Sequence, residues 1–336
     1  SSKTPAPRAP HCSCRNVLRG ACYGGSPCAR GPADGDVESD VEIVVAHCAH
    51  EFRFLSDLAD AIAARGLRVI RVTVVAKCGD NAGLRASLRA LRASDARPAA
   101  AVRLNDLLTV VHAKENVGRC DHSWAAFIDH RFSSLASRLL FLKDSWGAHT
   151  LNLLKRHNES QLADATALTR GFACAYSSRF LWHPTAALQM FNLSLYSRRH
   201  DQSGHGGAAD FMASERPFGS WIRALQLPSR SLQTEAYWPV CYGGGFVATR
   251  SAVTRVDRSV WARIVLSLRR GENIEEGHYM ERTWAALLTL PLQPEEERAL
   301  ACASRSAGTN TELGALVRCR CSDIRSCAAG STMPPH

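Results

Sequence analysis

The chain has 336 residues, of which 46% are hydrophobic and 21% charged, an ordinary balance for a globular protein. No apolar run approaches the roughly 18 residues that a membrane-spanning helix needs, so we expect no membrane span in this chain. The net charge of +10 comes mostly from scattered arginines, which argues against an adaptor that binds nucleic acid specifically.

The two ends of the chain differ from its middle. Residues 1–40 are rich in Pro, Gly, Ala and Cys and lack periodicity, which is typical of a tail or stalk. The chain opens on Ser1, so we expect a processed product from which a signal peptide or anchor could have been removed. Residues 296–336 are again rich in small residues and Cys. We therefore predict a single domain over residues 41–295.

The domain begins with the pattern strand, helix, strand. The apolar run over 42–46 predicts a strand, and residues 54–65 have helical spacing that Gly66 ends. Residues 69–75 form a second predicted strand, rich in β-branched side chains. Such a βαβ unit places its strands in parallel, with helices covering the faces of the sheet.

Alternating elements continue along the chain. Residues 84–92 predict a helix with leucines on one face and arginines on another, a solvated amphipathic pattern. A strand over 107–111, a helix over 124–132 and a buried strand over 139–142 follow.

The second half is less regular until residue 240 and contains a glycine-rich loop over 203–207. A strand is predicted within 243–249, followed by helices over 260–269 and 277–290, the last ended by Pro291. The prediction is an α/β fold, a mostly parallel sheet flanked by helices, with Cys-rich irregular termini.

The chain contains thirteen cysteines, eight of them gathered at its two ends. This clustering favours terminal segments stapled by disulfides in an oxidising compartment. A zinc site is the alternative, but Cys12-x-Cys14 and Cys319-x-Cys321 lack the usual two-residue spacing. Glycosylation sequons at Asn158 and Asn192 point to the same secretory compartment.

A first candidate site lies in the turn that contains Asn116, Gly118 and Arg119. Glycine lets the backbone approach a ligand closely, and arginine offers a planar fork to phosphate or carboxylate. Asp121 or Ser123 could cap the next helix, so that its N-terminus faces the same ligand. A tight turn with a surface arginine is the alternative.

Asp144 is a second candidate because it follows a buried strand. Ligands of open α/β sheets bind beyond the carboxyl ends of the strands, where an Asp can hold a metal or a sugar hydroxyl. Paired carboxylates would hold Mg²⁺ or Mn²⁺ against a diphosphate, but the segment here has a single carboxylate. Capping of the following segment is the alternative role.

A third candidate combines the glycines at 243–245 with the helix that carries His278, Glu281 and Trp284. Glu281 and Trp284 are three residues apart and are predicted to share a helix face. A sugar ring could stack on the indole while the carboxylate accepts a hydroxyl proton. Alternatively, Trp284 belongs to the core and Glu281 is solvated; a metal site of Glu276, His278 and Glu281 is disfavoured by its spacing. The sequence contains no Gly-x-Ser-x-Gly elbow, which argues against a nucleophilic hydrolase.

Taken in order, five segments resemble an uncharacterised family found in fungi, algae and related microbes, catalogued as a domain of unknown function. Its distinctive elements are an Asn-x-Gly-Arg turn and a Glu-Arg-x-Trp helix. The matching segments here are Glu42–Cys48, Asn116–Trp124, Leu140–Asp144, Gly244–Phe246 and Gly277–Trp284. This chain departs from the family at Cys120, where an acidic residue is usual, and at Lys143, where an amide is expected; Lys143 could replace part of a metal's charge.

The motif order is similar to that of GT-A-type glycosyltransferases, including the rhamnan-synthesis type. The resemblance implies a GT-A-like domain that moves a sugar from a nucleotide-sugar donor to a carbohydrate or glycoprotein hydroxyl, in the Golgi lumen or after secretion. A non-catalytic carbohydrate-binding protein on the same scaffold is the alternative. The implied residues are Glu281 as catalytic base, Asn116, Gly118, Arg119 and Asp144 for the donor, Gly244, Gly245, His278 and Trp284 for the acceptor, and Asp144 for Mn²⁺ or Mg²⁺.

Overall fold

A computed structural model describes residues 39–95, 102–113, 115–146, 159–169, 171–175, 180–193, 211–227 and 236–291. The predicted tails, apart from residues 39 and 40, lie outside these ranges, as does the loop over 203–207. The terminal cysteines and their predicted disulfides therefore lie outside the described residues.

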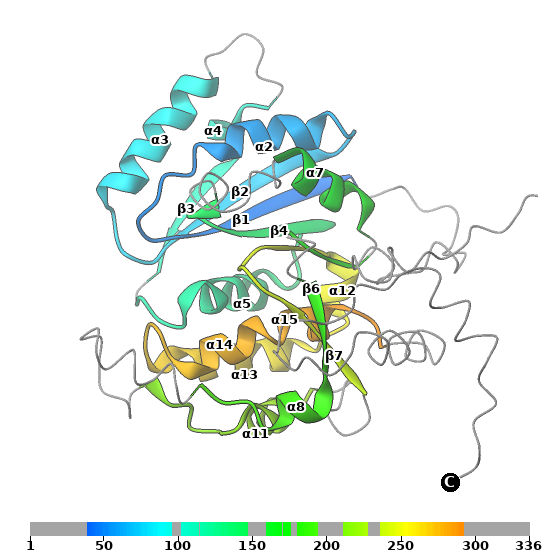
Figure 1. Ribbon diagram of the computed structural model, residues 1–336. Helices are drawn as coiled ribbons and strands as arrows, with labels where there is room; N and C mark the ends of the chain where they lie inside the picture. Colours follow the sequence, from blue (N-terminus) through cyan, green and yellow to red (C-terminus); the bar gives the residue numbers. More distant parts are fainter. Residues whose placement is uncertain are drawn as a thin grey trace, which may run out of the picture.

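The described residues form a mostly parallel sheet of six strands in the order β3-β2-β1-β4-β8-β5 (Figure 1). The first four strands of the chain are mutually parallel, and β8 runs antiparallel to both of its neighbours. The predicted βαβ unit and parallel sheet are confirmed. The strands are β1 (Asp40–His47), β2 (Arg68–Ala76), β3 (Leu108–His112), β4 (Arg138–Lys143), β5 (Phe172–Cys174) and β8 (Phe246–Thr249).

Alternation along β1 explains why the sheet needs cover on both faces. Ile43 and Val45 pack into one buried cluster and Val44 into the other, and all three are fully buried. Burying each such side chain stabilises the fold by about 1.5–3 kcal/mol. A strand with apolar side chains on both faces is stable only between two layers of helices.

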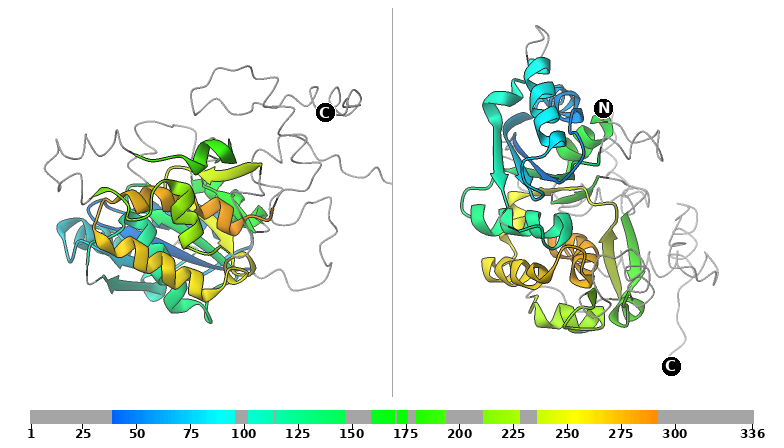
Figure 2. Two further views of the ribbon diagram at one scale, coloured as in Figure 1. Left: turned by 90° about the horizontal axis from the view of Figure 1, so that it is seen from below. Right: turned by 90° about the vertical axis from the view of Figure 1, so that its left-hand side faces the viewer.

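Helices cover both faces of the sheet (Figures 1 and 2). One layer contains α2 (Phe54–Ala63), α3 (Ala82–Asp95), α4 (Leu104–Leu107) and α7 (Glu159–Leu168). On α3, Leu84 and Leu91 are buried while the arginines at 85, 89 and 92 are exposed, as the amphipathic pattern predicted. The opposite layer contains α5 (Arg119–Arg131), α12 (Arg250–Thr254), α13 (Arg258–Ser267), the 3-10 turn η2 (Leu268–Arg270), α14 (Glu275–Glu281) and α15 (Trp284–Leu288).

Two further strands pair with each other beside the second layer (Figure 2). Their helices α8 and α11 close the same core, to which Leu188, Phe218 and Trp221 contribute. The elements are β6 (Phe180–Pro184), α8 (Thr185–Gln189), α11 (Phe218–Ala224) and β7 (Tyr237–Cys241).

The helix predicted over 277–290 is wrong in one respect, because it is two helices. Between α14 and α15, the amide groups of Arg282 and Thr283 donate to carbonyls three residues back, which tightens the last turn of α14. The Thr283 hydroxyl also donates to the Tyr279 carbonyl at 2.8 Å. Threonine thereby competes with regular helix hydrogen bonding, and the chain changes direction here.

Two disulfides lie within the described residues, and both are at the edge of the sheet where the parallel strands end. Cys48–Cys78 joins the loops after β1 and β2, and Cys174–Cys241 joins the ends of β5 and β7. They are compatible with a secreted or luminal protein. No helix in the described ranges has both the length and the apolar character needed to cross a membrane.

Candidate functional site

The first predicted turn lies at the carboxyl edge of the sheet. Gly118 and Arg119 both have left-handed backbone angles, with φ of 57° and 53°. Their amides donate to the carbonyls of Gly271 and Glu272 at 2.7 and 3.0 Å, which ties the turn to the loop before α14. A side chain at position 118 would lie 2.6 Å from the Leu268 carbonyl oxygen, so glycine is required.

This turn starts α5 five residues before the predicted helix. Gly118 occupies the N-cap position, and no side chain caps the helix there. The predicted capping role of Asp121 or Ser123 is therefore wrong, because both residues lie buried within the helix. Asn116 is half-buried just before the turn.

Lys77, which was not predicted as a site residue, forms hydrogen bonds to the backbone of this turn. Its ammonium group donates to the carbonyl oxygens of Val117 and Arg119. Burial lowers the pKa of Lys77 to about 8, although neighbouring acidic groups oppose that shift. Lys77 follows directly on β2, so the signal available in the sequence was a lysine at the carboxyl end of a parallel strand.

The two motif segments that are 159 residues apart meet at Arg119. Its Nη1 lies 2.9 Å from His278 Nδ1 and 3.9 Å from Glu281 Oε2. The Arg119 side chain crosses Gly277, where an added Cβ would lie 3.1 Å from its Cδ. The side chains of Arg119 and Glu281 remain 23% and 16% exposed, so solvent and a ligand can reach both.

The glycine turn lies on the other side of Glu281. The amide of Gly243 donates to Glu281 Oε1 at 3.3 Å. Gly244 has φ of 68°, and any side chain there would collide with the end of Lys143. The end of Lys143 therefore occupies the space that a side chain at position 244 would need. Gly245 is small for a different reason, since a Cβ added there would lie 3.2 Å from the Ala175 Cβ and 3.3 Å from the Trp146 ring.

Lys143 brings a second positive charge to Arg119. The pKa of Lys143 is raised, first by Cys120, whose thiolate forms only at high pH, and then by Glu281 and Asp121, against the effect of burial; Lys143 is therefore protonated at neutral pH. Burial raises the pKa of Cys120 to about 12, which keeps the thiol protonated and makes it a poor nucleophile. Cys120 and Lys143, where the chain differs from the motifs it resembles, are therefore close enough for their charges to act on each other.

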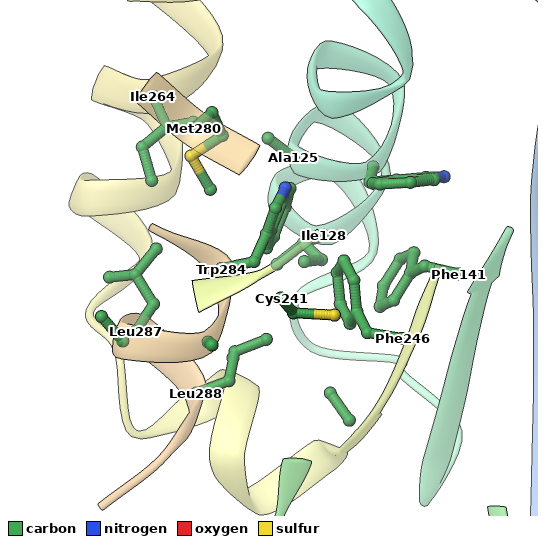
Figure 3. Close-up of a cluster of buried hydrophobic side chains, with 14 of the residues drawn as sticks. Ala125, Ile128, Phe141, Cys241, Phe246, Ile264, Met280, Trp284, Leu287 and Leu288 are labelled. Atoms are coloured by element: carbon green, nitrogen blue, oxygen red, sulfur yellow. The ribbon is translucent and has the colours of Figure 1, made fainter. Parts of the chain in front are cut away.

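Trp284 belongs to the core, which was the alternative interpretation of this residue. It is 2% exposed and packs against Phe246, Trp261 and Phe141, with ring centroids 4.9, 5.7 and 6.3 Å away (Figure 3). No open face remains on which a sugar could stack. The turn between α14 and α15 separates Trp284 from Glu281, so the predicted common face is wrong.

Trp284 nevertheless contacts a residue next to the site. Its indole N–H donates to Asp121 Oδ1 at 2.7 Å. Asp121 is 2% exposed, and burial raises the pKa of its carboxyl group. This buried acid lies under Arg119 and Lys143, whose charges act on it. It connects the aromatic core to the basic side chains.

Arg282, Tyr242 and His183 form a neighbouring group that the sequence analysis missed. The Arg282 guanidinium lies over the rings of Phe191 and Tyr242, at 4.2 and 5.3 Å from their centroids. The Tyr242 hydroxyl lies 3.2 Å from His183 Nε2. Tyr242 is half-buried and directly precedes the glycine turn, and the charges of Arg282 and Glu281 act on its hydroxyl group.

Asp144 has a different environment from the one predicted. Its Oδ2 lies 3.0 Å from His47 Nδ1 and accepts hydrogen bonds of 2.8–2.9 Å from three consecutive amides in the loop after β1. Asp144 itself is 6% exposed. The three amide donors are Cys48, Ala49 and His50. This carboxylate holds a loop, as in a capping role.

These contacts do not fit a Mg²⁺ or Mn²⁺ ligand, because the same oxygen already accepts several hydrogen bonds. Within the described residues, no group of three or more His, Cys, Asp or Glu side chains is placed to bind a metal ion.

Acid should selectively remove the contribution of Asp144 to stability. Burial raises the pKa of Asp144, but the hydrogen bonds from His47 and the loop amides outweigh it and lower the pKa to about 2, against an ordinary 3.8. The charged form therefore stabilises the fold above pH 4 by about 1–2 kcal/mol, and this contribution disappears as pH falls through 2.

Thermal denaturation of Asp144→Asn tests this expectation. Its Tm should lie several degrees below that of the unchanged protein at pH 5–7, and the gap should narrow between pH 4 and 2. Asp164→Asn is the control, because that exposed carboxylate pairs with Arg65 in solvent and should contribute little. A gap that is constant across this pH range would contradict the role given to Asp144.

Comparisons of this chain with protein-family models, curated proteins and solved structures returned no match. The family resemblance described from the motifs therefore stays a prediction.

Proposed function

We propose that the protein is a nucleotide-sugar-dependent glycosyltransferase with a GT-A-like domain. One observation supports this most: Arg119, Lys143 and Glu281 gather at the carboxyl edge of the parallel strands, beside the turn of Gly243 and Gly244. Ligands of open α/β sheets bind at this edge. The antiparallel β8 beside β4 is compatible with the GT-A-like arrangement.

The charges of this cluster suit a donor that carries a diphosphate. Arg119 offers a planar, permanently charged fork, and Lys143 offers a compact ammonium group. Both are held in place before a ligand arrives, Arg119 by Lys77 and His278, and Lys143 by the space that Gly244 leaves open. Preorganised positive charge is most effective where negative charge increases during a reaction.

Glu281 is the proposed base. The acceptor hydroxyl oxygen attacks the anomeric carbon of the donor, and its proton passes to the Glu281 carboxylate. The bond between the anomeric carbon and the phosphate oxygen breaks, and the nucleoside diphosphate leaves with the electron pair. Arg119 and Lys143 stabilise the negative charge that develops on the leaving phosphate. His278 and Lys77 are positioning residues, because they act through Arg119.

The acceptor sugar must bind without contact to Trp284. Trp284 cannot supply the stacking surface, so we assign that role to Tyr242, which directly precedes Gly243, the residue whose amide bonds to Glu281. A sugar ring in front of Tyr242 would place a hydroxyl toward Glu281. The acceptor is a carbohydrate or glycoprotein hydroxyl, as the resemblance implies.

Nucleotide-sugar binding is the first test. A screen of UDP-, GDP- and CMP-sugars should find one that raises the Tm by about 5–10 °C when it is present at a hundredfold excess over its Kd. Arg119→Ala should weaken the Kd for this donor at least about tenfold, since it removes a charged hydrogen-bond donor. Gly244→Ala should weaken it similarly, because the added methyl group displaces the end of Lys143.

Matched variants separate a lost contact from a damaged fold. Arg258→Ala removes an exposed arginine that pairs with Asp129, far along α5 from the site, and should leave donor affinity unchanged. Gly66→Ala adds a methyl group at φ of 75° with no atom within 4 Å, which matches the backbone strain of Gly244→Ala without the collision. No shift from any nucleotide-sugar would overturn the proposed donor site, and a shift from free sugar alone would favour the carbohydrate-binding alternative.

A further inference from the structure

A second site lies on the far side of α5, in a cavity of about 510 Å³ between this helix and the β2–β3 edge of the sheet. Val75 and Val111 line the sheet side, and Phe127 and Val265 line the helix side. Val111 is 46% exposed, so the cavity is open to solvent at the edge strand. Its volume lies within the roughly 300–1,000 Å³ of ordinary small-molecule sites.

Three residues of one helix line this cavity and also carry polar side-chain atoms without hydrogen-bond partners in the described part of the chain. Ser123 is 3% exposed, and its hydroxyl has no hydrogen-bond partner in the described part of the chain. His122 Nε2 and Arg131 Nε also lack a hydrogen-bond partner among the described residues. Ser123, His122 and Arg131 all line the cavity. Buried polar groups are normally hydrogen-bonded, so these three residues bring unused hydrogen-bonding groups to the wall of the cavity.

The two ends of the cavity differ in how their charged side chains are paired. Near the start of α5, the lining residues Arg269 and Glu115 lie 3.7 Å apart. At the same end, burial and the charges of Lys77 and Arg269 lower the pKa of His122 to about 4, so its imidazole is neutral and can accept or donate a hydrogen bond. At the end of α5, Arg131 has no acidic partner among the described residues. Arg71, in contrast, is paired with the buried Glu42 at 2.9 Å.

We propose that this cavity binds an elongated amphipathic carboxylate. Its carboxylate pairs with Arg131, and its apolar body lies between Phe127 and the β2–β3 face. A hydroxyl or amide group at its other end bonds to His122 and Ser123. Ser123, Phe127 and Arg131 are four residues apart, so they lie in one row along α5, with about 12 Å between its ends. The site is separate from the proposed donor site and does not depend on it.

Calorimetric titration with 12-hydroxydodecanoate, a probe with both end groups, tests this proposal. The folded protein should bind it in the micromolar range, and more tightly than dodecan-1-ol, which lacks the anion. Arg131→Gln should weaken the Kd at least about tenfold by removing the cation. Ala126→Phe should abolish binding, because Ala126 lines the cavity and a phenyl ring there fills it.

Arg258→Gln is the matched control, since this arginine lies outside the cavity and should leave the Kd unchanged. The Tm of each variant verifies that it is folded, and binding of the nucleotide-sugar at the donor site is followed in parallel. Absence of probe binding up to about 1 mM, or an unchanged Kd in a folded Arg131→Gln or Ala126→Phe variant, overturns the proposal.

Discussion

Glu281→Gln is expected to lower kcat for sugar transfer about a thousandfold, within the range of about 10²–10⁴ that a general base contributes. Glutamine has the same shape and can still accept the hydrogen bond from the Gly243 amide, but it cannot take a proton from the acceptor hydroxyl. The donor Kd should change by less than about threefold, because the phosphate contacts belong to Arg119 and Lys143.

Steady-state kinetics with the donor found in the nucleotide-sugar screen measure this effect, and the Kd of the same donor is followed by titration. Asp164→Asn serves as the control, since this exposed carboxylate pairs with Arg65 and lies on α7, in the opposite layer of helices from α14. A Glu281→Gln enzyme that keeps more than about a tenth of kcat would show that another group accepts the proton. Loss of donor binding in this variant would instead assign Glu281 to the positioning of Arg119.

Gly118→Ala is expected to lower the free energy of unfolding by about 3 kcal/mol, with a Tm lower by about 6–12 °C. Two effects add. The left-handed φ of 57° costs an alanine about 1–2 kcal/mol. The new Cβ would also lie 2.6 Å from both the Leu268 carbonyl oxygen and the His122 Cβ, atoms that cannot rotate away.

Gly66→Ala is the matched control for this effect. Gly66 has a φ of 75° but no atom within 4 Å of an added Cβ, so its substitution should cost only about 1 kcal/mol. Denaturant unfolding of both variants gives the two free energies. Equal destabilisation would show that the contact between Gly118 and η2 is loose, and that the turn of Arg119 is not rigidly held.

Much of the fold followed from local patterns. The runs over 42–46 and 69–75 predicted β1 and β2 because β-branched side chains in short apolar runs favour strands. The Asn-x-Gly-Arg turn was a candidate because glycine lets the backbone approach a ligand closely and arginine offers a planar fork to phosphate or carboxylate. His278, Glu281 and Arg119 were each candidates before the structure placed the first two within 4 Å of Arg119.

The remaining features depended on contacts between residues far apart in the chain. Periodicity alone continued the last helix from Glu281 to Trp284, because no proline or glycine interrupts it. The turn at Thr283 separates them, and the tryptophan then enters the aromatic core. Asp144 was predicted to bind a ligand, because the sequence does not show that three loop amides donate hydrogen bonds to its carboxylate.

By itself, the sequence determined the α/β class, the parallel strands and the identity of Arg119 and Glu281 as candidates, since these depend on short-range periodicity and turn chemistry. Only the tertiary structure decided that Lys143 fills the space at Gly244, and that a second cavity lies along α5. The first feature joins residues about a hundred positions apart in the chain, and the second lies between α5 and two strands that precede it. Such packing has no local signature, because it depends on how the layers fit against the sheet.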